Sequence, residues 1–381
     1  KFFMISKYRT KKLIQEIDCI KVIWEDNKTS KFHFLWLRDN CPSAIHPVAR
    51  MRTFNILTVS KKIHPINTSI NKNFLIIKWS EGNHKSKFKL KWLRDHCYTI
   101  NNNKYKSDYI YWDSKKIKNF KDYKINHDLI IKSDKYLIRW LEILKKYGFA
   151  IIKNAPVKKK SGFNILNRIS YHRETFFGTP FEVINIPKPN NTAYTSEALR
   201  NHTDLPYYEY MPGYQFLHCL INNADGGLSS VVDGFSVANY LKINNRKVYQ
   251  TLTNTDIRFK DQDYTQKSIR IFYSPLISLD KNKEYKEIRF SMAAMDALDI
   301  ASSKMKKFYE AYRIFAELIH NKKFVFNFRL EAGDIFCFDN RRVLHGRTSF
   351  DPNSGNRHLQ GYYIEREEII SRLNYLKIIK K

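Results

Sequence analysis

Short runs in which apolar and polar residues alternate dominate the first hundred residues. Residues 31–36 and 74–79 are two such runs, and the pattern extends over residues 20–98. A period of two places every second side chain on one face, which is typical of half-buried β-strands. The pattern therefore predicts a small β-rich N-terminal domain over residues 1–100.

Two similar hexads lie within this domain. Residues 36–41 read Trp-Leu-Arg-Asp-Asn-Cys, and residues 92–97 read Trp-Leu-Arg-Asp-His-Cys. We expect them to end equivalent strands. Two copies are too few for a solenoid of stacked repeats.

A weakly patterned stretch separates this region from the rest of the chain. Residues 101–127 are rich in Asn, Lys, Tyr and Asp, so we place a linker there and a larger domain over residues 128–381. That domain opens with an amphipathic helix, residues 135–147, and a buried strand, residues 148–152. A second helix is predicted over residues 303–319, and further strands over residues 214–220, 229–232, 323–329 and 334–338.

Charge and cysteine content exclude some classes of protein. The formal net charge of +30 would favour nucleic acid or an anionic membrane surface as a partner, but lysines are spread along the whole chain. Basic runs such as residues 158–160 lack interleaved aromatics, which favours a solvated basic surface without either partner. Five scattered cysteines indicate a reducing compartment, and no apolar run is long enough to span a membrane. We expect a cytoplasmic protein, and a start at Lys1 leaves a removed targeting segment open.

Three residues can form a metal site. His202 and Asp204 lie two positions apart, so on an extended strand both side chains would share one face. His345 follows the strand predicted to end at residue 338 and can supply a third ligand. Two histidines and one carboxylate on one face of a metal form the facial triad of non-haem Fe(II) oxygenases, which leaves three positions open for a cosubstrate and O₂.

Two residues outside the triad can bind an acidic cosubstrate. Arg357 follows His345 by twelve residues on a further predicted strand, and its guanidinium can pair with the far carboxylate of 2-oxoglutarate. Ser229, just after Gly226 and Gly227, can add a hydroxyl donor to the same carboxylate. The alternatives are a surface ion pair for Arg357 and a turn for Ser229.

Short segments across nearly the whole chain match the motifs of one family. They are residues 36–42, 92–95, 193–195, 202–204, 217–219, 226–227, 232–235, 333–334, 338–340, 344–347 and 357–359. In these segments the chain resembles the γ-butyrobetaine and trimethyllysine dioxygenases, within a larger group that includes taurine dioxygenase. The resemblance implies a mainly β fold with flanking helices, in which a double-stranded β-helix (jelly-roll) catalytic domain follows the small β-rich domain, and commonly a homodimer. It also implies Fe(II), 2-oxoglutarate and O₂, with Leu217 joining Arg357 and Ser229 around 2-oxoglutarate.

The resemblance further implies an aromatic cage for a trimethylammonium group. Such a group has no N–H to donate, so π-faces replace its hydration. The family positions of the cage are Phe177, Phe181, Tyr194 and Tyr363, where relatives usually carry Tyr and Trp at the first two. In a chain rich in Phe and Tyr, these residues could also be core aromatics.

The residues expected near the substrate's carboxylate match the family less well. Asn191 stands at the family position near this carboxylate, but Ser291 and Met292 stand where eukaryotic relatives have an Asn pair, and Thr192 where they have Lys. Ser291 or another cation could meet the carboxylate instead. We expect hydroxylation of a small quaternary-ammonium acid, in first place γ-butyrobetaine to carnitine. The alternatives are a trimethyllysine dioxygenase, another small-acid (taurine-like) dioxygenase, and a basic nucleic-acid-binding protein with a degenerate metal site.

Relatives bind structural zinc in the small domain through three cysteines and a histidine. In this chain Cys41 is kept, Ser43 and His46 replace the other two cysteines, and His84 lies near the histidine position. The set is one ligand short, so Cys41, His46 and His84 make a doubtful zinc site. Hydrogen bonds could hold the same turn.

Overall fold

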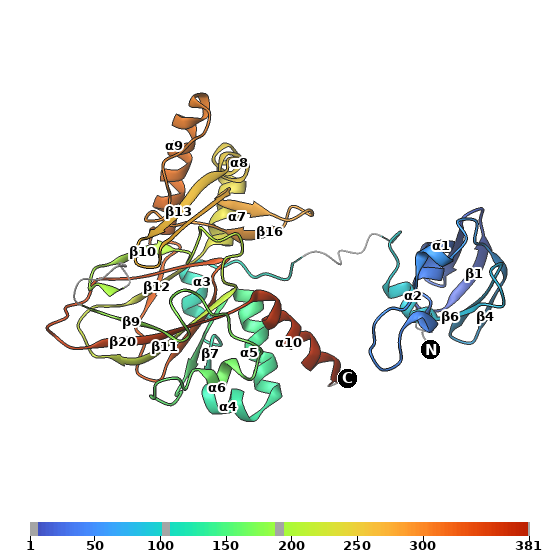
Figure 1. Ribbon diagram of the computed structural model, residues 1–381, viewed down its shortest axis with the longest axis horizontal. Coiled ribbons are helices and arrows are strands. Elements are labelled where there is room, and N and C mark those ends of the chain that lie inside the picture. The colour runs from blue at the N-terminus through green and yellow to red at the C-terminus, as the bar shows by residue number, and fades with distance from the viewer. Residues whose placement is uncertain (1–6, 101–106, 187–193, 380–381) are drawn as a thin grey trace. The chain divides into compact units, whose positions relative to one another are not determined.

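The computed structural model describes residues 7–100, 107–186 and 194–379, and the chain divides into two compact units, Lys1–Lys106 and Ser107–Lys381 (Figure 1). The linker predicted over residues 101–127 is too long, because Trp112 and Ile117 are buried in the core of the second unit. No helix within the described ranges is both long and apolar enough to cross a membrane.

The first unit consists of two similar halves, each a three-stranded antiparallel sheet followed by a short helix. The predicted β-rich region is therefore confirmed, but the hexads do not end strands. They fall mostly within the helices, because the buried residues there are three apart: Phe34 and Leu37 in the first, Leu90 and Leu93 in the second. The first half holds β1 (Thr10–Gln15), β2 (Cys19–Trp24), β3 (Thr29–His33) and α1 (Phe34–Asp39); 3₁₀ turns η1 (Pro42–Ala44) and η2 (Ile56–Thr58) follow; the second half holds β4 (Pro65–Asn71), β5 (Phe74–Trp79), β6 (Lys85–Lys89) and α2 (Leu90–Asp95).

The two halves repeat the same buried hydrogen bond. The indole nitrogen of Trp24 donates to the Ser30 hydroxyl, and that of Trp79 donates to the Ser86 hydroxyl, both at 2.8 Å. All four side chains are fully buried, so each bond satisfies a polar group that water cannot reach. The same serines also bond cysteines of the opposite halves, in the pairs Ser86–Cys41 and Ser30–Cys97.

Ion pairs between the halves follow the same reciprocal pattern. Arg38 in the first hexad pairs with Glu81 of the second half, with 3.2 Å between Nε and Oε2. Arg94 in the second hexad pairs with Asp26 of the first half, with 2.7 Å between Nη2 and Oδ2. Each acid lies two residues after the buried tryptophan of its own half. The halves are therefore held together by equivalent contacts in both directions.

The second unit is built around two β-sheets with the strand orders β7-β8-β18-β11-β20-β9 and β10-β19-β12-β17. The predicted strands are confirmed, but the one expected over residues 323–329 is limited to three residues, because the turn that ends the preceding helix continues to residue 325. The six-stranded sheet contains β7 (Lys124–Asn126), β8 (Phe149–Lys153), β9 (Phe181–Ile184), β11 (Tyr214–Asn222), β18 (Ile335–Asp339) and β20 (Arg357–Ile364); the four-stranded sheet contains β10 (Leu199–His202), β12 (Ser229–Asp233), β17 (Phe326–Phe328) and β19 (Val343–Arg347).

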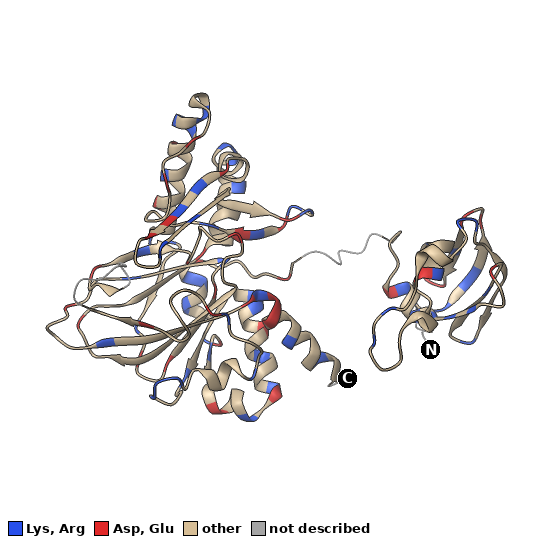
Figure 2. Cartoon of the chain, viewed as in Figure 1, with Lys and Arg blue, Asp and Glu red and all other residues tan. Residues whose placement is uncertain are grey.

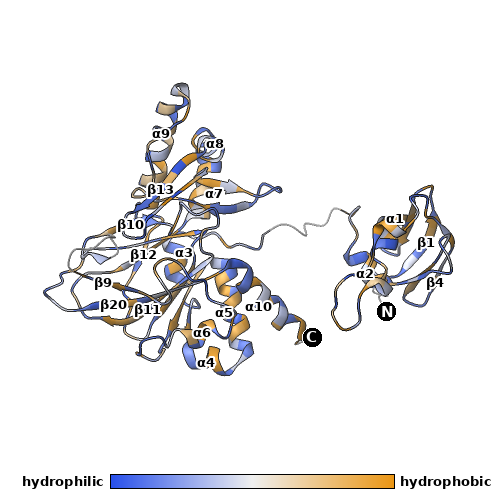
Figure 3. Cartoon of the chain, viewed as in Figure 1, coloured by the Kyte–Doolittle hydropathy of each residue, from blue (hydrophilic) through white to orange (hydrophobic). Residues whose placement is uncertain are grey.

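Successive side chains of β11 point to opposite faces of the six-stranded sheet, one of which packs against helices. Phe216 packs edge-on against Trp140 of helix α5 (Asp134–Tyr147), with ring centroids 6.1 Å apart, so even-numbered side chains face the helices. Gln215 and Leu217 point to the opposite face. Hydrophobic positions run along α5 and the central strands, where the larger core lies (Figure 3).

Helices flank the sheets in two groups, and the predicted helices over residues 135–147 and 303–319 are confirmed as α5 and α9. The first group packs beside the six-stranded sheet around α5. The second group packs with two short hairpins around a separate hydrophobic cluster. The remaining elements are α3 (Ser114–Asn119), α4 (His127–Lys132), α6 (Phe163–Leu166) and α10 (Arg366–Ile379), then α7 (Gly234–Asn244), α8 (Arg246–Asn254), α9 (Ser302–Ile319), and the hairpin strands β13 (Ile257–Asp263), β14 (Ser268–Ser274), β15 (Ile277–Leu279) and β16 (Tyr285–Ile288).

A fully buried ion pair ties several of these elements together. The Arg342 guanidinium donates to both carboxylate oxygens of Asp233, at 3.0 and 2.8 Å. It also donates to the carbonyls of Lys146 and Ile110, each at 2.8 Å. Neither charged side chain is accessible to water. This guanidinium therefore joins the end of α5, the start of the unit and the end of β12.

We predict that Asp233→Asn lowers the free energy of unfolding by about 3–5 kcal/mol, because it leaves the buried guanidinium without a counter-charge. Urea unfolding followed by circular dichroism measures the change. As a control, Glu317→Gln removes the exposed partner of Arg313 and should cost less than about 1 kcal/mol. Equal effects of the two variants would contradict the structural role given to the buried pair.

Candidate metal centre

His202 and His345 lie opposite each other on neighbouring strands. β10 and β19 pair in antiparallel register with His202 facing His345, and the ring centroids are 4.4 Å apart. Gly346 allows the strands to approach, since a Cβ at this position would lie 2.5 Å from the carbonyl oxygen of Leu199. Strand pairing therefore brings together two histidines that are far apart in the sequence.

Asp204 does not lie on the strand, contrary to the prediction, because β10 ends at His202. Its backbone is held instead by Asn340, which is fully buried. The Asp204 amide donates to the Asn340 side-chain oxygen at 2.7 Å, and the Asn340 side-chain amide donates back to the Asp204 carbonyl at 3.0 Å. The next residue, Leu205, has a φ of 54°, so the chain turns sharply just after the carboxylate.

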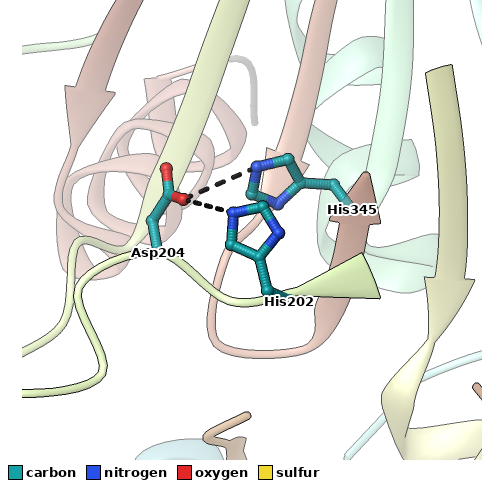
Figure 4. Close-up of side chains that lie close together, drawn as sticks. All are labelled: His202, Asp204 and His345. Atoms are coloured by element: carbon teal, nitrogen blue, oxygen red, sulfur yellow. Dashed lines mark ion pairs between the residues drawn. The ribbon is translucent and has the colours of Figure 1, made fainter. Parts of the chain in front are cut away.

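The three side chains point towards one another (Figure 4). The Nε2 atoms of His202 and His345 lie 3.2 and 3.6 Å from the same oxygen of Asp204, Oδ1. Ligands about 2.1 Å from a metal and at right angles lie about 3 Å from one another, so these atoms fit around a single ion. In the parts of the chain that the structure describes, these are the only three His, Cys, Asp or Glu side chains whose ligand atoms gather within 4.8 Å.

Hydrogen bonds and burial prepare these ligands. The Tyr363 hydroxyl donates to Asp204 Oδ2 at 2.7 Å, which leaves Oδ1 for a metal, and His202 Nδ1 lies 2.9 Å from the Arg200 carbonyl, which leaves Nε2. Burial lowers the pKa of His345 to about 3, so the neutral, metal-binding imidazole is favoured. Burial alone would raise the pKa of Asp204, but the two histidines and Tyr363 hold it well below its usual range.

A cavity of about 430 Å³ opens beside the triad and is lined by both sheets. Arg357 lies in its wall at 8% exposure, with no acidic side chain within ion-pair distance among the described residues, and its Nε donates no hydrogen bond to any of them. Burial lowers its pKa to about 10. A buried cation without a counter-charge is costly unless an anion binds. Ser229 and Leu217, which were predicted to lie around 2-oxoglutarate, line the same cavity.

The four residues expected to form the aromatic cage also line this cavity. The ring of Phe181 lies 6.0 Å from that of Phe177 and 5.1 Å from that of Tyr363. Tyr194 completes the set, and the Tyr363 hydroxyl is already bonded within the metal centre. The expected Asn191 lies outside the described residues.

Several residues of the site were missed by sequence reasoning. Arg347 donates to the backbone carbonyls of Thr195 and Glu197 and so holds the segment next to Tyr194. It lies two residues after His345 inside a family motif, which is the signal that could have found it. Asn340 also lies in a motif segment, but its bond to residue 204 could not be inferred. Further cavity-lining residues are Tyr207, Gln215, Lys260 and Asp261.

The side chains of the doubtful zinc site do not converge. The Cys41 thiol lies 3.1 Å from the Ser43 hydroxyl and accepts a hydrogen bond from Ser86 at 3.0 Å. His84 Nε2 lies 3.4 Å from that same Ser86 hydroxyl, whereas His46 Nδ1 accepts from two backbone amides of its own turn. Described residues 7–100 contain no set of three metal ligands. Hydrogen bonds therefore hold this turn.

Two histidines and one carboxylate beside an open cavity, with a buried arginine in its wall, define the class of non-haem iron oxygenases. Residues 118–363 match the family described as "Taurine catabolism dioxygenase TauD, TfdA family", and residues 12–94 match "Gamma-butyrobetaine hydroxylase-like, N-terminal". The chain belongs to the TauD/TfdA dioxygenase family, and it is a 2-oxoglutarate-dependent non-haem iron dioxygenase.

Curated relatives are similar over almost their whole length. The chain is 35% identical over 383 residues to the gamma-butyrobetaine dioxygenase of Pseudomonas sp. (strain AK-1), covering 98% of this chain and 99% of the relative. It is 30% identical over 370 residues to the gamma-butyrobetaine dioxygenase of Homo sapiens, covering 94% of each. The trimethyllysine dioxygenase of Meyerozyma guilliermondii is 27% identical over 381 residues, covering 95% of this chain and 94% of the relative.

We predict that His345→Ala abolishes turnover and weakens iron binding. The loss of affinity should exceed the roughly 10–100-fold that is typical when a metal ligand loses only its hydrogen-bond partner. Iron content after dialysis and Fe(II) titration measure the effect. His172→Ala, which changes an exposed histidine outside the cavity lining, should leave both unchanged. Full iron content and full activity in His345→Ala would exclude this residue as a ligand.

Proposed function

We propose that the protein hydroxylates a small acid that carries a quaternary ammonium group, with γ-butyrobetaine as the substrate and carnitine as the product. The observation that carries this proposal is the aromatic wall beside the triad, formed by Phe177, Phe181, Tyr194 and Tyr363. A trimethylammonium group cannot donate a hydrogen bond, so ring faces are the groups suited to replace its hydration. The names of two of the curated relatives support the same substrate.

In this proposal His202, Asp204 and His345 hold the iron. Arg357 binds the far carboxylate of 2-oxoglutarate, with the Ser229 hydroxyl and the Leu217 side chain beside it. When bound, iron, 2-oxoglutarate and O₂ supply the oxidising chemistry that places oxygen on a C–H group. The chain itself orients the substrate, so that one carbon faces the metal and the others do not.

The distribution of charge supports a small-molecule substrate. Lys and Arg side chains are scattered over helices and strands of both units and do not form one stripe (Figure 2). The buried Arg357 faces a cavity of about 430 Å³, which suits one or two small acids better than a nucleic acid. A trimethyllysine dioxygenase would in addition need groups that bind an α-amino acid head group.

We further propose that the two sheets of the second unit form a double-stranded β-helix, and that the protein is a cytoplasmic homodimer. The mostly antiparallel pairing of strands within each sheet, and the cavity that both sheets line, support the first point. The family resemblance supports the dimer, and five free cysteines support a reducing compartment. Sedimentation of the purified protein tests the dimer.

We predict that Arg357→Met raises the KM for 2-oxoglutarate by about 10–100-fold, because a buried carboxylate loses its charged partner. Initial rates at saturating γ-butyrobetaine measure this change. Arg246→Met, which alters an exposed arginine of α8, serves as the control and should leave KM unchanged. An unaltered KM in Arg357→Met would assign the role to another cation.

We predict that the protein prefers γ-butyrobetaine over its primary-amine analogue 4-aminobutyrate, and that Tyr194→Ala lowers kcat/KM for γ-butyrobetaine on the order of tenfold. A ring face stabilises a caged cation by about 0.5–2 kcal/mol, whereas a primary ammonium must shed tightly bound water. Substrate-coupled succinate release measures both substrates. Equal kcat/KM values for the two acids in the parent enzyme would contradict the proposed cage.

A further inference from the structure

Three of the six Asp, Lys and Arg side chains that line the cavity already have partners within the protein. Asp204 belongs to the triad, and Arg347 is bonded to backbone carbonyls. Asp261 pairs with Arg270 at 2.8 Å, so its charge is balanced. With Arg357 assigned to the cosubstrate, the cavity cations that lack an ion pair or side-chain hydrogen bond within the described ranges are Lys260 and Arg200.

Lys260 reaches the cavity because of its place on β13. Its neighbour Phe259 is buried in the hydrophobic cluster formed with the second group of helices. Alternation along the strand therefore turns Lys260 to the other side, where it is half-buried and lines the cavity. Lys260 is thus part of the wall of a partly enclosed space, where a charge acts more strongly than at an open surface.

The turn that packs beside Lys260 is neutral. The Lys260 amide donates to the Ala294 carbonyl at 2.9 Å, and the Met295 amide donates to the Ser291 carbonyl at 3.1 Å. Backbone hydrogen bonds therefore hold Lys260 beside the turn that begins at Ser291. This turn contributes Ser291, Met292, Ala293 and Ala294 to the cavity lining, and these side chains offer one hydroxyl and no charge.

We propose that Lys260 binds the carboxylate of the substrate and makes the enzyme selective for acids over neutral quaternary amines. The inference rests on the proposed function, because it assumes a substrate with a quaternary ammonium at one end and a carboxylate at the other. The aromatic rings take the first group, and the second requires a donor that carries positive charge. A lysine ammonium on a flexible stem can follow the carboxylate of acids of somewhat different length.

Arg200 is the rival cation. It is exposed, lies on β10 two residues before His202, and uses its backbone carbonyl to orient that ligand. No backbone hydrogen bond links it to the neutral turn at Ser291. Partial burial and the backbone link to this turn therefore favour Lys260. The experiment below compares variants of both residues.

The experiment determines KM for γ-butyrobetaine and for 2-oxoglutarate in the full-length, iron-loaded enzyme. The variants compared with the parent are Lys260→Met, Lys260→Arg, Arg200→Met and the control Lys247→Met. Lys247 is exposed on α8, outside the cavity lining. Lys260→Met should raise KM for γ-butyrobetaine on the order of tenfold and leave KM for 2-oxoglutarate unchanged. Lys260→Arg should keep most of the affinity, and Lys247→Met should match the parent. Calorimetric binding of γ-butyrobetaine to the anaerobic enzyme with iron and 2-oxoglutarate should show the same order of affinities.

A substrate change isolates the charge. In the parent, the carboxamide analogue of γ-butyrobetaine should be a poorer substrate than the acid, and in Lys260→Met this preference should largely disappear. If the parent oxidises γ-butyrobetaine but Lys260→Met leaves its KM and the preference for the acid within twofold, the inference is overturned and the proposed function stands. A loss in Arg200→Met alone overturns it in favour of that arginine. No turnover of γ-butyrobetaine by the parent overturns the proposed function and the inference with it.

Discussion

The metal centre depends on one hydrogen-bonded clamp, in which Asn340 holds the Asp204 backbone from both sides. The clamp is needed because the strand that carries His202 ends before the carboxylate is reached. Asn340 lies between β18 and β19, and β19 carries His345. One short segment therefore places the second histidine by strand pairing and the carboxylate by a side chain. A shift of β19 along its neighbours would misplace two of the three ligands at once.

Periodic patterns predicted the elements well, and they failed where a distant contact decides the backbone. The amphipathic helix α5 and the buried strand after it follow from local sequence, because a single face of each is apolar. The alternation around residues 202–204 predicted one continuous strand, but the partner that bends the chain there lies 136 residues away. The hexads were misassigned for a different reason: the helices that hold them are only six residues long, which is too short a run to separate a period of two from a helical turn.

Some site residues could likewise be predicted from local sequence, whereas others depend on distant contacts. Motif spacing predicted His202, Asp204 and His345 as metal ligands, because imidazole and carboxylate side chains are the groups that bind iron in a facial triad. Arg357 was predicted to bind the 2-oxoglutarate carboxylate, with a surface ion pair as the alternative. In a chain with 67 Lys and Arg residues, the sequence does not show its distinguishing property, which is burial without a counter-charge among the described residues. The Tyr363 hydroxyl and Lys260 depend on which face of a strand meets the cavity. Such information requires the register of the sheets.

The reciprocal ion pairs of the first unit resemble the contacts of a symmetric dimer, although both halves belong to one polypeptide. Arg38 and Arg94 each pair with an acid of the other half, so both contacts form only when the two halves are packed together. The cysteines repeat this exchange between the halves: Cys41 bonds Ser86 and Cys97 bonds Ser30, so each thiol uses the buried serine of the other half.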